Sequence, residues 1–137
     1  MVGRPCELAG WLMALLLVAA IFAPAAPAST GCNSRACRER VARKQCSQKR
    51  PVPCVRRAAI HWRVSFPMLL RKARCESRLR PLATNGAHAG LFQFRVAAPS
   101  TWATTPYARR SPWRAKWNAL AAGWAHHVGR GGEWSCV

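Results

Sequence analysis

The chain has 137 residues, a length that leaves room for one compact domain and little else. It carries a formal net charge of +18, from 22 lysines and arginines against four acidic residues, and fifteen of the basic residues lie between positions 35 and 80. A field of this strength favours polyanionic partners, such as nucleic acid, anionic lipid or acidic cell-wall polymers.

The first 28 residues predict a secretory signal peptide. Arg4 precedes an apolar run at positions 11–22, and the segment ends in the Ala-x-Ala pattern of residues 26–28. An uncleaved membrane anchor is the alternative, but the run is shorter than the roughly 20 residues that a spanning helix needs. We therefore expect a secreted protein with no stable membrane span after processing, for which nucleic acid is the least expected polyanion.

Export determines how the seven cysteines are interpreted. Cys6 falls inside the predicted signal peptide, and the other six predict a disulfide framework that sequence alone leaves with fifteen pairings. A zinc site is the competing interpretation. It is disfavoured because no Cys-x-x-Cys pair occurs and the histidines, at positions 61, 88, 126 and 127, are not spaced as a ligand set. No metal and no cofactor is expected.

Residues 29–53 form a segment rich in cysteine and arginine. A short helix is expected at 37–46, followed by a break at Pro51-Val52-Pro53. The four cysteines between positions 32 and 54 favour two local bridges. Because the segment is too polar to build its own core, we expect a basic arm clamped onto a domain at residues 54–137.

Two helices are expected after this arm. The first has four apolar residues at helical spacing: Val55, Ala58, Ala59 and Trp62. The second is capped by Ser65, carries Pro67 in its first turn and runs into the sequence Cys75-Glu76-Ser77. Its buried face is expected to comprise Leu69, Leu70 and Ala73.

The remaining elements complete an α+β, mainly α, prediction. Asn85-Gly86 indicates a turn, residues 90–94 a short strand or hairpin, and Ser100 the cap of a short helix. The last helix is expected to begin at Ser111 and Pro112 and to stop at Gly129. Its apolar stripe, with the tryptophans assigned to the core, comprises Trp113, Trp117, Leu120, Ala121, Trp124 and Val128.

Acidic residues are scarce enough to restrict the chemistry. The predicted mature chain has no aspartate and only three glutamates, Glu39, Glu76 and Glu133, and it contains no Gly-x-Ser-x-Gly elbow and no phosphate loop. Glu39 stands among arginines, which make it a poor proton donor. Glu76 follows an apolar helix and precedes an aromatic-rich segment, a setting that suits a general acid. A structural ion pair with a neighbouring arginine is the alternative.

Four sequence motifs, in this order, resemble the lysozyme-like superfamily: Cys75-Glu76-Ser77, Gly90-Leu91-Phe92-Gln93-Phe94, Ser100-Thr101-Trp102 and Glu133-Trp134-Ser135-Cys136. Over residues 55–137 the chain is most similar to soluble lytic transglycosylase-like domains and resuscitation-promoting factors of actinobacteria. The resemblance implies a lysozyme-like (goose-type lysozyme or transglycosylase) domain that cleaves the MurNAc-GlcNAc β-1,4 bond of peptidoglycan.

The same resemblance implies roles for single residues. Glu76 becomes the catalytic acid, Gln93 lies in the glycan groove, and Cys75 pairs with Cys136. Further candidates for substrate binding are Ser77, Phe94, Trp102 and Tyr107, with Phe92 as another aromatic residue of the groove; for the phenylalanines and Trp102, core packing is the alternative. The Ala-Tyr-Asn motif of typical soluble lytic transglycosylases is absent, which leaves the product chemistry open.

A mechanism with one acid is expected. A second carboxylate would have to lie about 5–9.5 Å from the first, and only Glu133 could supply it. Otherwise the N-acetyl group of the sugar stabilises the oxocarbenium-like centre, and the product has a 1,6-anhydro or a reducing end. The expected partners of this monomer are peptidoglycan glycan strands and anionic wall polymers. The alternatives are a non-catalytic glycan-binding protein and a cationic, membrane-active defence protein.

Overall fold

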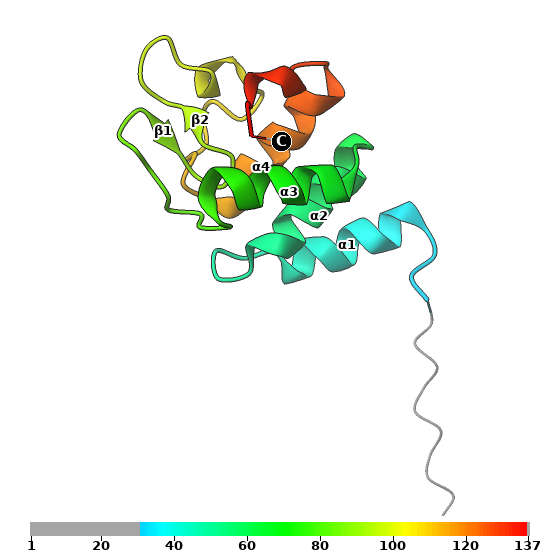
Figure 1. Ribbon diagram of the computed structural model, residues 1–137. Coiled ribbons are helices and arrows are strands. Elements are labelled where there is room, and N and C mark those ends of the chain that lie inside the picture. Colours follow the sequence, from blue (N-terminus) through cyan, green and yellow to red (C-terminus); the bar gives the residue numbers. More distant parts are fainter. Residues whose placement is uncertain (1–30, 137) are drawn as a thin grey trace, which may run out of the picture. The chain divides into compact units, whose positions relative to one another are not determined.

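Four α-helices and one two-stranded antiparallel sheet make up the part of the chain that the structure describes, residues 31–136. The computed structural model (Figure 1) has these elements: α1 (Arg35–Gln45), α2 (Pro51–Trp62), α3 (Phe66–Ser77), β1 (His88–Ala89), β2 (Phe94–Arg95), the 3-10 turn η1 (Trp102–Thr104), α4 (Ala115–His127) and η2 (Gly131–Glu133). The predicted α+β, mainly helical class is confirmed. The predicted signal peptide lies outside the described residues.

The basic arm is continuous with the rest of the fold. Helix α1 packs against α2, and Arg35 donates hydrogen bonds to the carbonyls of Ile60 (3.0 Å) and His61 (2.7 Å) near the end of α2. The break predicted at residues 51–53 is wrong: these residues form the first turn of α2, where proline fits because the backbone N–H groups there have no partner within the helix. The boundary predicted after residue 53 therefore falls inside α2.

Helices α2 and α3 follow their sequence signals closely. In α2, the predicted Val55 is buried, and α3 begins at a Ser65 cap whose hydroxyl accepts a hydrogen bond from Met68 N (3.4 Å). Leu69 and Ala73 are fully buried, as predicted for the inner face of α3, whereas Leu70, predicted with them, is only partly buried. Each helix stops at an arginine in the left-handed region, which ends the run of helical hydrogen bonds.

Helix α4 differs from its prediction in two ways. It begins at Ala115, three residues after Pro112, where the Gln48 side chain accepts a hydrogen bond from the Ala115 N–H (2.9 Å). Its buried face consists mainly of alanines, whereas within the predicted stripe the tryptophans at 113, 117 and 124 are only partly buried and Val128 is exposed. Helix α2 approaches closely at this face: a Cβ atom on Gly123 would lie 2.8 Å from Cδ1 of Trp62 and 3.1 Å from Ala58 O. Small residues on α4 make room for this approach.

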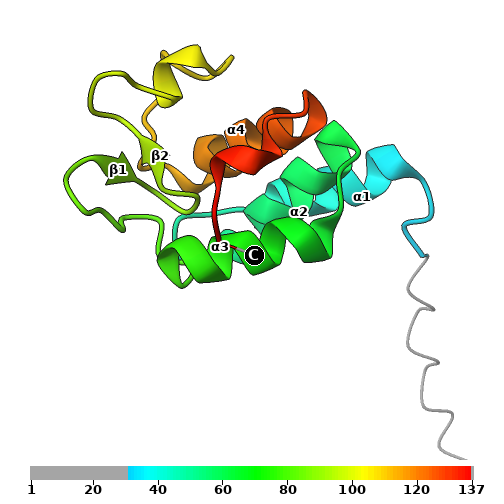
Figure 2. The same cartoon turned by 45° about the horizontal axis from the view of Figure 1, so that its top comes forward.

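A hairpin and the C-terminal segment complete the fold. β1 pairs with β2 in the register His88 to Arg95 and Ala89 to Phe94, so residues 90–93 form the turn of the predicted hairpin. The segment after η2 returns alongside α3 (Figures 1 and 2). Among the described residues, no helix combines the length and the apolar character needed to cross a bilayer.

Three disulfides join all six cysteines outside the predicted signal peptide. Two are local, Cys32–Cys37 and Cys46–Cys54, and both lie within or next to the arm. The third joins Cys75 at the end of α3 to Cys136, the pairing that the resemblance implied. The long bridge holds the C-terminal segment on α3.

The two kinds of bridge should differ in their contribution to stability. Cys75 and Cys136 are 61 residues apart, and the chain-entropy model assigns a loop of that size about 4 kcal/mol. The five-residue separation of Cys32 and Cys37 gives only about 2 kcal/mol. We expect the double replacement by serine to lower the free energy of unfolding in urea about twice as much for Cys75 and Cys136 as for Cys32 and Cys37. Equal losses would contradict this.

Candidate active site

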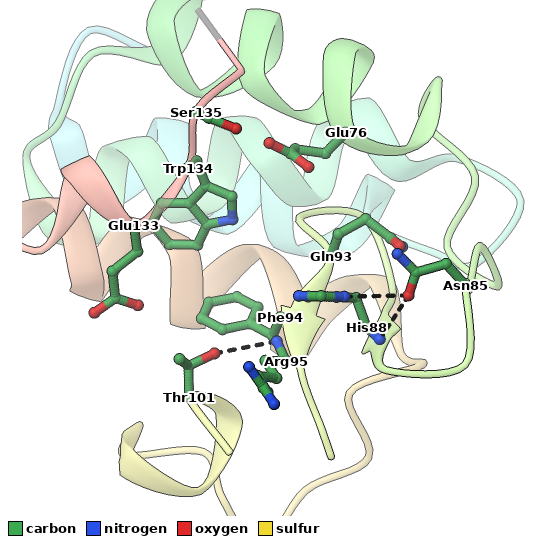
Figure 3. A pocket seen from close by; sticks show the side chains of 10 residues that line it. All are labelled: Glu76, Asn85, His88, Gln93, Phe94, Arg95, Thr101, Glu133, Trp134 and Ser135. Atoms are coloured by element: carbon green, nitrogen blue, oxygen red, sulfur yellow. Dashed lines mark hydrogen bonds between the residues drawn. The ribbon is translucent and has the colours of Figure 1, made fainter. Parts of the chain in front are cut away.

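A cavity of about 320 Å³ lies where the end of α3, the hairpin and the C-terminal segment meet (Figure 3). Four regions of the chain contribute its walls. The lining residues are Glu76, Asn85, His88, Gln93, Phe94, Arg95, Thr101, Glu133, Trp134 and Ser135. Three of the predicted site residues, Glu76, Gln93 and Phe94, thus share one cavity.

Glu76 occupies the last turn of α3. Its side chain is partly buried, and its carboxylate points toward the C-terminal segment that carries Trp134 and Ser135 (Figure 3). Within residues 31–136, no hydrogen bond or ion pair engages this carboxylate. The ion pair with a neighbouring arginine, considered as an alternative, is therefore not formed there.

Gln93 sits in the hairpin turn with a backbone φ of 47°. Its side-chain N–H₂ donates to the carbonyls of Ala83 (2.9 Å) and Gly90 (2.8 Å). Both amide hydrogens are used in this way, so the side-chain oxygen remains as an acceptor on the cavity wall. The hydrogen bonds fix the side chain before any ligand arrives.

Glu133 lines the same cavity but has a partner. Arg130, the residue before the 3-10 turn η2, donates a hydrogen bond from Nε to the Glu133 carboxylate. Glu39, the third glutamate, is far in sequence from the cavity residues and bonds to His61 Nδ1 (2.9 Å). Of the three glutamates, only Glu76 combines a cavity with an unpaired carboxylate.

Three predicted substrate-binding residues do not line this cavity. Ser77 is buried and donates from its hydroxyl to Ala73 O (3.1 Å), a bond within α3. Trp102 packs edge-on against Phe94, with ring centroids 5.4 Å apart, and is buried. Tyr107 stacks on Trp117 of α4. Phe92 and Phe94 are buried as well, so the core-packing alternative holds for both phenylalanines and for Trp102, although Phe94 also borders the cavity.

The cavity also contains polar residues that the sequence did not single out. Asn85 Oδ1 accepts hydrogen bonds from His88 N (2.9 Å) and lies 3.1 Å from His88 Nδ1, and Thr101 Oγ1 accepts from Arg95 N (3.1 Å), as drawn in Figure 3. Asn85 was noted only for its turn. Because these residues converge from separate loops, no local pattern identifies them as a group.

Asn118 of α4 holds the hairpin turn in place. Its side chain is completely buried, and Oδ1 accepts from Phe92 N (2.8 Å) while Nδ2 donates to Ala89 O (3.1 Å) and Pro112 O (2.8 Å). The amide lies so close to Gly90 that an added Cβ would meet Nδ2 at 2.2 Å. Asn118 thereby positions the backbone that presents Gln93 to the cavity.

We expect Asn118→Ala to cost about 3 kcal/mol or more, because it leaves several buried backbone groups without partners. Asn85→Ala is the matched control: Asn85 is exposed, and its loss should cost about 1 kcal/mol or less. Urea unfolding of both variants measures the difference. Similar costs would mean that the buried amide does not hold the hairpin.

A buried lysine and a histidine support the cavity wall from behind. Lys72 is 8% exposed and donates from Nζ to Trp134 O (3.4 Å) and Cys136 O (3.1 Å). The His126 ring stacks on Trp134 with centroids 5.3 Å apart, and its buried Nε2 finds no hydrogen-bond partner in the described part of the chain. Burial, and secondarily the Lys72 ammonium, lowers the pKa of His126.

This arrangement predicts a loss of stability in mild acid. Since the pKa of His126 is lower in the folded chain, the unfolded chain binds more protons once the pH falls below about 6.5. The contribution of neutral His126 to the free energy of unfolding is therefore complete above that pH, and it declines as the pH falls toward the pKa of His126 in the folded chain. Comparing urea midpoints at pH 7.5 and 5, His126→Gln should reduce the decline. The exposed His127→Gln should leave it unchanged, and identical behaviour of the two variants would refute the assignment.

Comparison with known proteins gave no assignment. No protein-family model matches the sequence, and neither the curated proteins nor the solved structures include a significant match. Among residues 31–136, no three His, Cys, Asp or Glu side chains are grouped as a metal site would require. The function must therefore be argued from the cavity itself.

Proposed function

We propose that this protein is a secreted peptidoglycan-cleaving glycosidase of lysozyme-like type, in which Glu76 is the general acid. The observation that carries the proposal is the unpaired Glu76 carboxylate in a cavity of about 320 Å³, a size suited to a small polar ligand such as a sugar. Phe94 and Trp134, which are 2% and 7% exposed, form the apolar floor of the cavity, and Gln93 supplies a fixed acceptor. Polar groups beside an apolar floor suit a ligand of this kind.

The proposed reaction begins with a proton transfer. Protonated Glu76 gives its proton to the glycosidic oxygen, and the bond from this oxygen to the anomeric carbon breaks with both electrons leaving on the oxygen. The sugar's N-acetyl group stabilises the positive anomeric centre. Glu76, now a carboxylate, takes a proton from the 6-hydroxyl of the same sugar or from water as that oxygen attacks. The products are a 1,6-anhydro end in the first case and a reducing end in the second.

Among residues 31–136, Glu133 is the one other side-chain carboxylate that lines the cavity, and it is a candidate for a two-carboxylate mechanism. Its ion pair with Arg130 favours a structural role, because a catalytic base or nucleophile would have to leave this partner or act through it. The single-acid mechanism needs no second carboxylate. A variant at each glutamate separates the two mechanisms.

We expect Glu76→Gln to lower cleavage of purified sacculi by at least about 100-fold, because a positioned general acid contributes roughly 10²–10⁴ to the rate. Glu133→Gln should retain activity within about tenfold of the unmodified protein. Mass analysis of the released muropeptides measures both and identifies the product ends. Undiminished cleavage by Glu76→Gln would remove the proposed mechanism.

The same variant distinguishes the alternative functions. A non-catalytic wall-binding protein would release no muropeptides before or after the change. A membrane-active defence protein would permeabilise vesicles of anionic lipid equally well with Glu76→Gln. The three disulfides support a protein that works outside the reducing cytoplasm, where such bridges persist.

A further inference from the structure

Two basic side chains lie against an aromatic pair formed by Tyr107 and by Trp117 of α4, neither of which lines the Glu76 cavity. Tyr107 and Trp117 stack with centroids 5.8 Å apart. Lys116 Nζ lies 4.1 Å from the centroid of the Trp117 ring, and the Arg110 guanidinium carbon lies 5.0 Å from it. Contacts of this type hold cations in fixed positions. Arg43 of α1 and Arg57 of α2 lie near enough for their charges to lower the pKa of Lys116, and we call these four cations the basic cluster.

The members of the basic cluster repel one another. Burial lowers the pKa of Lys116, and the charges of Arg57, Arg110 and Arg43 lower it further. Burial also lowers the pKa of Arg57; Glu39 opposes this effect and Arg43 adds to it. Arg43, Arg57 and Arg110 thus disfavour the charge of Lys116, and Arg43 disfavours that of Arg57.

The cluster lacks a matching set of acceptors. Arg57 Nε and Nη1 are buried without a hydrogen-bond partner among the described residues. Glu39, the one carboxylate whose charge reaches Arg57, is already hydrogen-bonded to His61. The described carboxylates thus leave most of the positive charge of the cluster without a counter-charge, and an anion bound beside Lys116 would offset it.

Space for such an anion lies next to the cluster. A second cavity, of about 370 Å³, borders the first turn of α4 and includes a fifth cation, Arg114. It is lined by Ser47, Gln48, Arg114, Lys116 and Trp117. None of these residues lines the Glu76 cavity, so an anion and a sugar chain could be bound at the same time.

We propose that the basic cluster is a second binding site, which takes phosphodiester groups of an anionic cell-wall polymer while a glycan strand occupies the Glu76 cavity. The choice of a wall polymer rests on the proposed function, whereas the anion site rests on the cluster and its cavity. Guanidinium groups match the paired oxygens of phosphate. A nucleic acid is less suited, because its bases need free aromatic faces and Trp117 is already engaged by Tyr107, Lys116 and Arg110.

The test measures binding of the full mature chain carrying Glu76→Gln, so that cleavage does not interfere. The cluster variant adds Arg43→Gln, Arg110→Gln and Lys116→Gln and keeps the half-buried Arg57. The matched control instead adds Arg38→Gln, Arg71→Gln and Arg74→Gln, three exposed arginines with no side-chain partner within residues 31–136, so both proteins lose the same charge. The substrates are sacculi that retain their phosphodiester polymers and the same sacculi stripped of them by hydrofluoric acid.

On untreated sacculi we expect the cluster variant to bind at least tenfold more weakly than the control variant, and its affinity to depend less steeply on salt. On stripped sacculi the two variants should bind alike. Soluble tripolyphosphate should raise the melting temperature of the control variant more than that of the cluster variant. The melting transition of the cluster variant also shows that this variant is folded.

Three results would overturn the proposal. Equal losses in the two variants would mean that only net charge matters. A difference that persists on stripped sacculi would assign the cluster to the glycan. If duplex DNA displaces the protein from untreated sacculi at a lower concentration of phosphate groups than tripolyphosphate does, the cluster is assigned to nucleic acid. The binding test uses Glu76→Gln and therefore does not depend on cleavage. If the cluster anchors the protein as expected, but the chain with Glu76 intact releases no muropeptides, only the glycosidase proposal is refuted.

Discussion

The buried amide of Asn118 is the interaction on which the cavity depends. It joins α4 to the hairpin and to the loop before α4 through three hydrogen bonds, and no other side chain among the described residues bonds to the backbone of residue 92 and residue 89 together. A buried amide stabilises a structure only when its hydrogen bonds are made with correct geometry, so the hairpin can adopt essentially one position. Gly90 is required for the same reason, since any side chain there would overlap the amide.

The opposite wall of the cavity is held by different means. The Cys75–Cys136 bridge and the Lys72 hydrogen bonds keep the C-terminal segment on α3, and the Trp134 indole N–H donates to Phe92 O in the hairpin turn. Trp134 therefore links the two walls that Asn118 and the disulfide fix separately. A small alanine-rich core leaves little packing energy to hold such a site, and the covalent and buried polar connections supply what packing does not.

The sequence predicted those features that depend on neighbours along the chain. The Ser65 cap, the inner face of α3 and the hairpin are local patterns, and the scarcity of acids with the motif around residues 75–77 directed attention to Glu76. The start of α4 and the exposure of its tryptophans could not be predicted, because both depend on the approach of α2 and on Gln48, which is 67 residues from Ala115. The burial of Asn118 could have been predicted from the sequence, because it is a polar residue between Trp117 and Ala119, on the apolar side of a helix.

The charge of the chain makes the state of Glu76 informative. With 22 basic residues and four acids, an ion pair is the expected state of a carboxylate. Glu39 has a hydrogen-bond partner in His61, and Glu133 follows this expectation with Arg130. Glu76 does not, although Arg74, Arg78 and Arg80 flank it in sequence: it occupies the last turn of α3 and turns its carboxylate toward the C-terminal segment, and Arg80 bonds instead to Ser77 O. A fold that keeps one carboxylate away from so many cations, at the wall of a cavity, preserves the unpaired group that proton transfer to a ligand requires.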